Sequence, residues 1–261
     1  MKRVLSGLVL IPVVLGIVQY GSPLLFLTLV TAAVLTGWYE YVRLVRHIGI
    51  HINPIVGGAM CLLLVFCFYR NDFYLVWLAG CLMSLFIAWY ASGADLEDSL
   101  NQVAYSFLGV VYVSGLMSYF IHLRGMEHGN FVLYFLFMVV WSGDIAAYYV
   151  GKNIGKTPLA PKISPGKTIE GSVAGLAGSM AGGVAAKYLF FETLPLNHGL
   201  IMALLCGTMG QIGDLAESLF KRRAGVKDSG SLIPGHGGVL DRLDSLMFAG
   251  PVFYIYHRLF F

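Results

Sequence analysis

The sequence predicts an all-α polytopic membrane protein, and two observations support that fold class. Apolar residues make up 57% of the 261 residues and charged residues only 12%, whereas roughly 25% of an ordinary soluble domain is charged. Long apolar runs recur along the whole sequence, and many reach the ~20 residues that a membrane-crossing helix needs. Once these runs are assigned to helices, no separate soluble domain remains.

Apolar windows separated by polar or glycine- and proline-containing clusters predict about nine transmembrane helices. We expect these helices at residues 4–20, 23–43, 53–69, 73–91, 102–122, 131–151, 169–190, 200–220 and 240–260. The first window has the basic head of a secretory signal, but no small-x-small cleavage pattern follows it. We therefore interpret it as a retained span, with a cleaved signal as the alternative.

The basic residues predict the orientation of these helices. With a cytoplasmic N-terminus, 13 of the 17 Lys and Arg residues fall on the inner side and 4 on the outer side. This distribution follows the positive-inside tendency of membrane proteins. Two polar loops, residues 152–168 and 221–239, are then cytoplasmic.

The four cysteines lie in apolar runs without the spacing of a zinc site or a disulfide framework, so we expect them to be packing residues.

The two halves of the chain differ in polarity. Residues 1–100 contain structural N-terminal transmembrane helices, in which Glu40 is almost the only ionisable residue. Because two tyrosines flank Glu40, we interpret it as part of an interfacial belt. Residues 101–261 form the predicted catalytic region, since polar residues crowd its spans and inner loops. Within it, residues 169–190 carry glycines at four-residue spacing, which allows helix backbones to approach closely in lipid.

Acidic residues lie within the last two predicted helices. Four polar residues share one face of the first of these helices, at i, i+3, i+4 and i+7: Asp214, Glu217, Ser218 and Lys221. Asp214 is roughly 10 Å from the cytoplasmic end of that helix, where an unpaired carboxylate costs several kcal/mol. The following helix starts near Val239 and carries Asp241, Arg242 and Asp244 in its first turns. Because the two helices are antiparallel, we expect Asp214 and Asp241 to face a shared crevice.

These charges have a simpler interpretation, in which they neutralise one another. Glu217 would pair with Lys221, and Arg242 with a neighbouring acid, but the remaining acids would then compete for few partners. Oxygen ligands suit Mg²⁺, which binds one or two carboxylates together with water and phosphate oxygens. We therefore expect a magnesium site built from acids of this region: Asp144, Asp214, Glu217, Asp241 and Asp244.

Both inner loops are basic and rich in glycine. The loop at 221–239 begins with a cluster of Lys and Arg, and its glycine-rich turn has backbone N–H groups that can approach anionic oxygens closely. The loop at 152–168 spaces four lysines among Gly, Pro and Ser, without matching the Walker pattern. Such loops alone are typical of topology signals or contacts with anionic lipid. Beside buried acids, we interpret them as a phosphate clamp.

Several short motifs occur in a fixed order near the end of the chain: Ser218-x-x-Lys221-Arg222, Lys227-Asp228, Pro234-Gly235-His236-Gly237-Gly238 and Asp241-Arg242-x-Asp244. This order resembles the signature of the phosphatidate cytidylyltransferase family. The upstream segments SGDIAAYYVG and ISPGKTIEG are also similar to family segments, so the resemblance spans roughly residues 140 to 250.

The resemblance implies transfer of a cytidylyl group from CTP to phosphatidic acid, with CDP-diacylglycerol and pyrophosphate as products. It also implies dependence on Mg²⁺, a second monovalent cation such as K⁺, a homodimer, and Asp214 and Asp241 as the metal-site acids. A cytoplasmic nucleotide and a membrane lipid require a site open to both. We therefore expect the active site between the C-terminal helices at the cytoplasmic interface of a bacterial-type inner membrane, with no nucleic acid as partner.

The residues that we expect to act in catalysis are acids and bases of the last two helices and their loop: Asp214, Lys221, Arg222, Lys227, Asp228, Asp241 and Arg242. Those that we expect to bind substrate are Lys167, Ser218, Gly235, His236, Gly237 and Gly238. His236 is open to three interpretations, as a general base, as a residue that orients the turn, or as a phosphate ligand.

Four other functions compete with this interpretation. One is a membrane transferase that joins a nucleotide-linked group to a lipid phosphate. Another is a CDP-alcohol phosphotransferase, which would carry a D-G-x-x-A-R motif that the sequence lacks. An ion-coupled transporter would explain ionisable residues within spans, but transporters usually show repeated halves, whereas the polar motifs here lie only in the C-terminal half. A non-catalytic membrane scaffold would not explain why acidic residues lie within the predicted spans.

Overall fold

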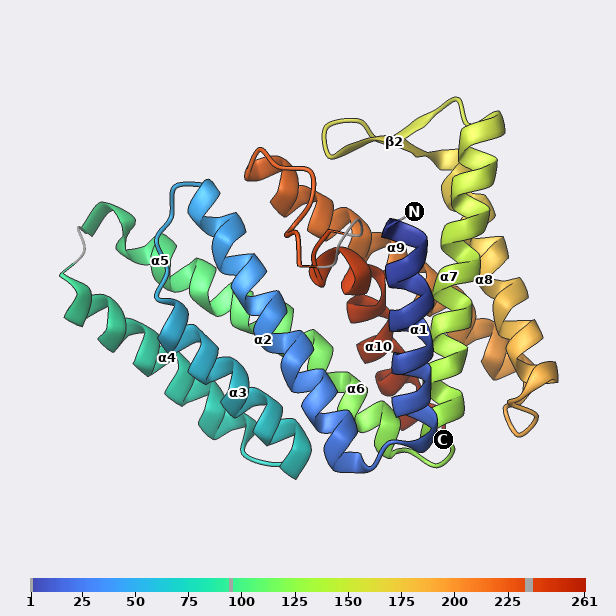
Figure 1. Ribbon diagram of the computed structural model, residues 1–261, viewed down its shortest axis with the longest axis horizontal. Coiled ribbons are helices and arrows are strands. Elements are labelled where there is room, and N and C mark those ends of the chain that lie inside the picture. The colour runs from blue at the N-terminus through green and yellow to red at the C-terminus, as the bar shows by residue number, and fades with distance from the viewer. Residues whose placement is uncertain (1, 94–95, 233–236) are drawn as a thin grey trace. The chain divides into compact units, whose positions relative to one another are not determined.

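The computed structural model describes residues 2–93, 96–232 and 237–261, and most of this chain is helical (Figure 1). The helices are α1 (Lys2–Tyr20), α2 (Pro23–His47), α3 (Pro54–Arg70), α4 (Tyr74–Ser92), α5 (Leu96–Gly109), the π-helix η1 (Val110–Gly115), α6 (Leu116–Gly125), α7 (Gly129–Ile154), α8 (Ile169–Leu189), α9 (Leu196–Arg223) and α10 (Leu240–Phe260).

Each of the nine apolar windows coincides with a helical segment, in one case with the consecutive α5, η1 and α6. Among the described residues, five helices are long and apolar enough to cross a membrane: Pro23–His47, Tyr74–Ser92, Ser99–Gly125, Gly129–Ile154 and Leu196–Arg223. The prediction of a helical integral membrane protein is therefore confirmed. The count of nine spans and the cytoplasmic N-terminus stay predictions.

The loop at 152–168 contains a short antiparallel hairpin that the sequence patterns did not predict. Its strands are β1 (Pro158–Ala160) and β2 (Ser164–Thr168). The hydroxyl of Thr168 accepts a hydrogen bond from the Gly171 N–H, at 3.1 Å, and so caps the start of α8. The hairpin therefore leads directly into a capped helix, and this connection positions Lys167 near the end of β2.

The chain divides into two compact units. Unit 1 comprises Met1–His122 and Phe220–Arg242, and unit 2 comprises Leu123–Leu219 and Leu243–Phe261. Two helices therefore contribute to both units, because α9 and α10 each contain one of the boundaries. The expected functional division near residue 100 concerns chemistry rather than packing and stays a prediction.

In unit 1, α2 packs against α5, which continues into η1. The Tyr41 ring is fully buried, and its hydroxyl donates a hydrogen bond to the carbonyl oxygen of Tyr105, at 2.9 Å. Gly109 makes this approach possible, because a Cβ atom there would overlap the Tyr41 ring. The π-helix begins directly after Gly109, and π-helical turns frequently occur near functional sites. Packing around Tyr41 thus sets the position of its neighbour on α2, Glu40.

In unit 2, α7 and α8 pack with their backbones in close approach. A Cβ atom on Gly178 would lie 2.8 Å from the carbonyl oxygen of Ser142, and one on Gly182 would lie 2.9 Å from that of Met138. These distances are too short for a side chain at either glycine. The close approach predicted from the glycine spacing of residues 169–190 is therefore confirmed.

Candidate active site

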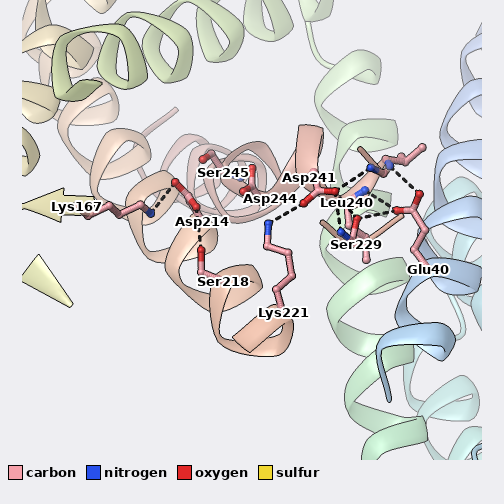
Figure 2. A network of polar contacts seen from close by, with 12 residues as sticks. Glu40, Lys167, Asp214, Ser218, Lys221, Ser229, Leu240, Asp241, Asp244 and Ser245 are labelled. Atoms are coloured by element: carbon pink, nitrogen blue, oxygen red, sulfur yellow. Dashed lines mark hydrogen bonds and ion pairs between the residues drawn. The ribbon is translucent and has the colours of Figure 1, made fainter. Parts of the chain in front are cut away.

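Asp241 is the centre of a polar cluster in unit 1, at the first turn of α10. Its Oδ1 atom lies 2.7 Å from the Nζ atom of Lys221. Its Oδ2 atom accepts three hydrogen bonds, each 2.8 Å long, from the Ser229 N–H, the Ser229 hydroxyl and the Gly238 N–H. The Lys221 and Asp241 side chains are only 14% and 6% exposed. Figure 2 shows this carboxylate held on both of its oxygens.

The backbone around Lys221 and Asp241 explains how the sequence brings them together. The Val226 N–H donates to the Lys221 carbonyl oxygen at 3.0 Å, and Gly225 has a φ of +69°. This arrangement ends α9 with a Schellman motif. Gly237, with a φ of +82°, lies so close to Asp241 that an added Cβ atom would be 2.7 Å from Oδ2. These two glycines therefore adopt the positive φ angles that the backbone needs at the end of α9 and beside the Asp241 carboxylate.

A second carboxylate, that of Glu40 on α2, belongs to the same cluster. Its Oε1 atom accepts from the Val239 N–H at 2.9 Å, and its Oε2 atom accepts from the Leu240 N–H at 2.9 Å and from the Ser229 hydroxyl at 3.2 Å. Glu40 is only 2% exposed, so its interpretation as an interfacial belt residue is wrong. The sequence signal for these contacts was the position of Glu40, because a lone acid among apolar residues requires internal partners.

Unit 2 contains a separate cluster around Asp214 of α9. Its Oδ2 atom lies 2.6 Å from the Nζ atom of Lys167, and the Ser218 hydroxyl donates to Oδ1 at 3.4 Å. The side chains of Lys167 and Asp214 are 27% and 35% exposed, so this ion pair is more accessible to solvent than the Lys221–Asp241 pair of unit 1. Asp144 of α7 is close enough for its charge to interact with both. This cluster therefore combines two carboxylates with one ammonium group, and Figure 2 shows the pair formed by Lys167 and Asp214.

Asp144 also lines a small hollow in unit 2. The hollow is lined mainly by small residues: Val140, Gly143, Ser179, Gly207, Gly210 and Gln211. Its cavity volume is about 10 Å³, and a cavity needs about 10–15 Å³ to hold one water molecule. The hollow is therefore too small to be a substrate site.

Two of the acids that were expected to compete for few partners each have a lysine as partner. Asp214 pairs with Lys167, and Asp241 pairs with Lys221. Lys221 thus pairs with Asp241, and the pairing of Lys221 with Glu217, which is fully buried, stays a prediction. Asp244, for its part, accepts from the Ser245 N–H at 2.7 Å.

Other expected site residues lie at the surface or outside the described chain. Four of them are exposed: Arg222, Lys227, Asp228 and Arg242. Gly235 and His236 lie outside the described residues. The catalytic and substrate-binding roles of all these residues stay predictions.

The chemistry of the aspartates is suitable for a hard divalent cation. In the described parts of the chain, no group of three or more His, Cys, Asp or Glu side chains forms a metal site. Mg²⁺, however, usually binds one or two carboxylates and completes its coordination with water and substrate phosphates. Asp241 Oδ2 accepts three protein hydrogen bonds, while its Oδ1 atom has Lys221 as its partner in the described chain. The residues present therefore fit Mg²⁺, and Oδ1 is the better placed of the two oxygens to bind it.

The helical membrane fold, with one buried and one partly exposed acid–lysine pair, defines an integral membrane protein with charged side chains suited to catalysis. Comparison of sequences identifies its class more narrowly, because the family model described as "Cytidylyltransferase family" matches residues 1–260. The chain belongs to this cytidylyltransferase family, and it is a nucleotidyltransferase.

Its relatives include bacterial proteins named phosphatidate cytidylyltransferase. The protein of Bacillus subtilis (strain 168) is 32% identical over 268 residues, which cover 99% of this chain and 98% of that protein. The protein of Synechocystis sp. is 32% identical over 289 residues, or 98% of this chain and 95% of that protein. The protein of Brucella suis biovar 1 is 41% identical over 184 residues, or 70% of this chain and 64% of that protein.

Proposed function

We propose that this enzyme transfers the cytidylyl group of CTP to phosphatidate, which gives CDP-diacylglycerol and pyrophosphate. One observation carries this proposal: the chain matches nearly the full length of two proteins named phosphatidate cytidylyltransferase. The acid–lysine clusters support it, because a reaction between two anionic substrates requires fixed positive charge. This reaction would supply an activated lipid for phospholipid biosynthesis.

The chemistry requires no strong base. Phosphatidate is a phosphate monoester with a second pKa near 6, so at neutral pH it is mostly a dianion and already a nucleophile. One of its oxygens attacks the α-phosphorus of CTP in line, and pyrophosphate leaves from the opposite side. His236 therefore needs no role as a general base. Catalysis consists mainly of positioning the substrates and neutralising their charge.

Lys221 is the residue best prepared to neutralise that charge. Its ion pair with Asp241 orders the lysine side chain before substrates arrive, and charges that are already oriented stabilise a transition state most effectively. In this proposal Arg222, Lys227 and Arg242 neutralise further phosphate oxygens. Lys167 and Ser218, both in contact with Asp214, bind substrate in unit 2.

Asp214 and Asp241 would hold Mg²⁺, with contributions from Asp144, Glu217 and Asp244, and a monovalent cation such as K⁺ would accompany it. When bound, Mg²⁺ supplies positive charge to the phosphate oxygens of CTP. The support is chemical, since every one of these side chains offers oxygen ligands. We further propose that the enzyme is a homodimer of the inner membrane, with its active site facing the cytoplasm.

The direct test is turnover by the purified protein in detergent with CTP and phosphatidate. We expect CDP-diacylglycerol and pyrophosphate in equal amounts. Release of CMP would indicate a phosphotransferase of the CDP-alcohol type instead. If correctly folded protein leaves CTP unconsumed in the presence of Mg²⁺ and phosphatidate, the proposed function is wrong.

A further inference from the structure

We propose that Glu40 is a positioning residue, which fixes the segment before α10 and thereby the orientation of Asp241, a role that rests on the proposed function. Glu40 lies on α2, far from the signature motifs in sequence. Its carboxylate nevertheless contacts Ser229, Val239 and Leu240, all within unit 1 (Figure 2).

The first argument concerns the two ends of the loop segment that leads to α10. Ser229 lies at one end and Val239 at the other, and both donate to the Glu40 carboxylate, at 3.2 Å and 2.9 Å. A single buried side chain therefore fastens the segment at both ends. Without Glu40, Ser229 and Val239 would lose their common anchor.

The second argument concerns the hydroxyl that joins the two carboxylates. The Ser229 Oγ atom lies 3.2 Å from Glu40 Oε2 and 2.8 Å from Asp241 Oδ2. A serine hydroxyl has only one hydrogen to donate, so the two carboxylates share it. Because the Ser229 N–H also donates to Asp241 at 2.8 Å, a shift of Ser229 away from Glu40 would move a donor of Asp241. Glu40 is thus mechanically connected to Asp241 through one residue.

The third argument concerns the start of α10. The first N–H groups of a helix lack partners within the helix, and negative charge is favourable there. The Val239 and Leu240 N–H groups donate to Glu40, and the Gly238 N–H donates to Asp241. Glu40 therefore caps, from another helix, the very turn that carries Asp241.

The fourth argument concerns shape, because the glycines of this segment fit around Glu40. A Cβ atom on Gly230 would lie 2.7 Å from Glu40 Oε1, and one on Gly238 would overlap both Glu40 Oε2 and the Ser229 hydroxyl. On α2, the buried Tyr41 next to Glu40 is fixed by its hydrogen bond to Tyr105. Backbone atoms therefore enclose the Glu40 carboxylate. A side chain that donates hydrogen bonds where the carboxylate accepts them would not fit unless the surrounding backbone moved.

Glu40→Gln is the most informative variant. Glutamine keeps the size of the side chain but replaces one oxygen with an NH₂ group, which can only donate and would face the N–H donors of Val239 or Leu240. We expect kcat per folded molecule to fall about 10- to 100-fold, as small misplacements of catalytic groups do. We also expect amide hydrogen exchange to accelerate about tenfold or more at residues 238–240, with other helices unchanged.

Two further variants complete the experiment. Glu127→Gln makes the same chemical change at a side chain that is 93% exposed, so it should leave activity and exchange unchanged. Ser229→Ala removes only the shared hydroxyl and should remain folded, with a smaller loss of kcat. Because Glu40 and Ser229 act through the same contact, the loss of kcat in the double variant should be smaller than the product of the two single losses.

The outcomes separate this role from a purely structural one. A wild-type value of kcat in Glu40→Gln overturns the proposal. The proposal is also overturned if activity falls only in proportion to the fraction of folded protein and exchange accelerates in all helices. If Glu40→Gln does not fold, wild-type kcat and exchange in Ser229→Ala overturn it. If the wild-type protein transfers no cytidylyl group, the proposed function is wrong. The exchange measurement tests the role of Glu40 separately: unchanged exchange at residues 238–240 in Glu40→Gln would show that Glu40 does not fix this part of the chain.

Discussion

Replacing Lys221 by methionine should destabilise the protein much more than replacing Lys167 by methionine. Both lysines pair with an aspartate at a similar distance, 2.7 Å for Lys221 and 2.6 Å for Lys167. The pairs differ in exposure, since the side chains of the first pair are 14% and 6% exposed and those of the second 27% and 35%. Methionine preserves the aliphatic stem and removes only the charge.

The expected magnitudes follow from this difference. Removing one partner of a buried ion pair costs about 3–5 kcal/mol, and the three hydrogen bonds that remain on Asp241 place Lys221→Met near the lower limit, at about 3 kcal/mol. An accessible pair such as Lys167 and Asp214 contributes about 1 kcal/mol or less. We therefore expect a difference of about 2 kcal/mol in the free energy of unfolding between the two variants.

Reversible denaturant-induced unfolding in mixed micelles measures both free energies, with Lys221→Met/Asp241→Asn as the control. When both charges of the pair are removed together, no unpaired buried charge remains, so the double variant should be more stable than Lys221→Met alone. Equal destabilisation by the two lysine variants would refute the reasoning. So would a double variant no more stable than Lys221→Met.

Two further changes test the site and the packing. Asp214→Asn and Asp241→Asn should each lower turnover at least about 100-fold, as loss of charge stabilisation does, while the protein stays folded in the membrane; near-normal rates in both would contradict the proposed metal site. Gly182→Ala and Gly238→Ala should each lower the free energy of unfolding by about 1–3 kcal/mol, because an added methyl group would overlap neighbouring atoms. Gly80→Ala, with nothing within 4 Å of its added Cβ atom, is the control, and equal effects in all three would contradict this packing.

The helices were predictable because lipid leaves a membrane-embedded backbone no partners except its own, so apolar windows of sufficient length become helices. The hairpin at Pro158–Thr168 and the π-helix Val110–Gly115 were not predictable in this way. The hairpin has strands of three and five residues, and the π-helix starts directly after Gly109, which packs against Tyr41. Neither leaves a periodic pattern in the sequence.

The acids and lysines of the site were predictable because ionisable residues in apolar spans are costly and need a reason. Their partners were not. Lys167 reaches Asp214 from a hairpin, and Glu40 bonds to Leu240 across 200 positions of sequence. Sequence spacing predicts which residues share one helix face, but only the folded chain shows which faces meet.

The central claim is that Asp214 and Asp241 bind a divalent ion together with the phosphates of CTP. Anomalous diffraction from crystals of the protein soaked with Mn²⁺ and CTP would test it most directly, because Mn²⁺ also prefers oxygen ligands. The claim predicts a strong peak within bonding distance of both carboxylates. A peak bound to neither aspartate, in crystals that clearly contain the nucleotide, would contradict it.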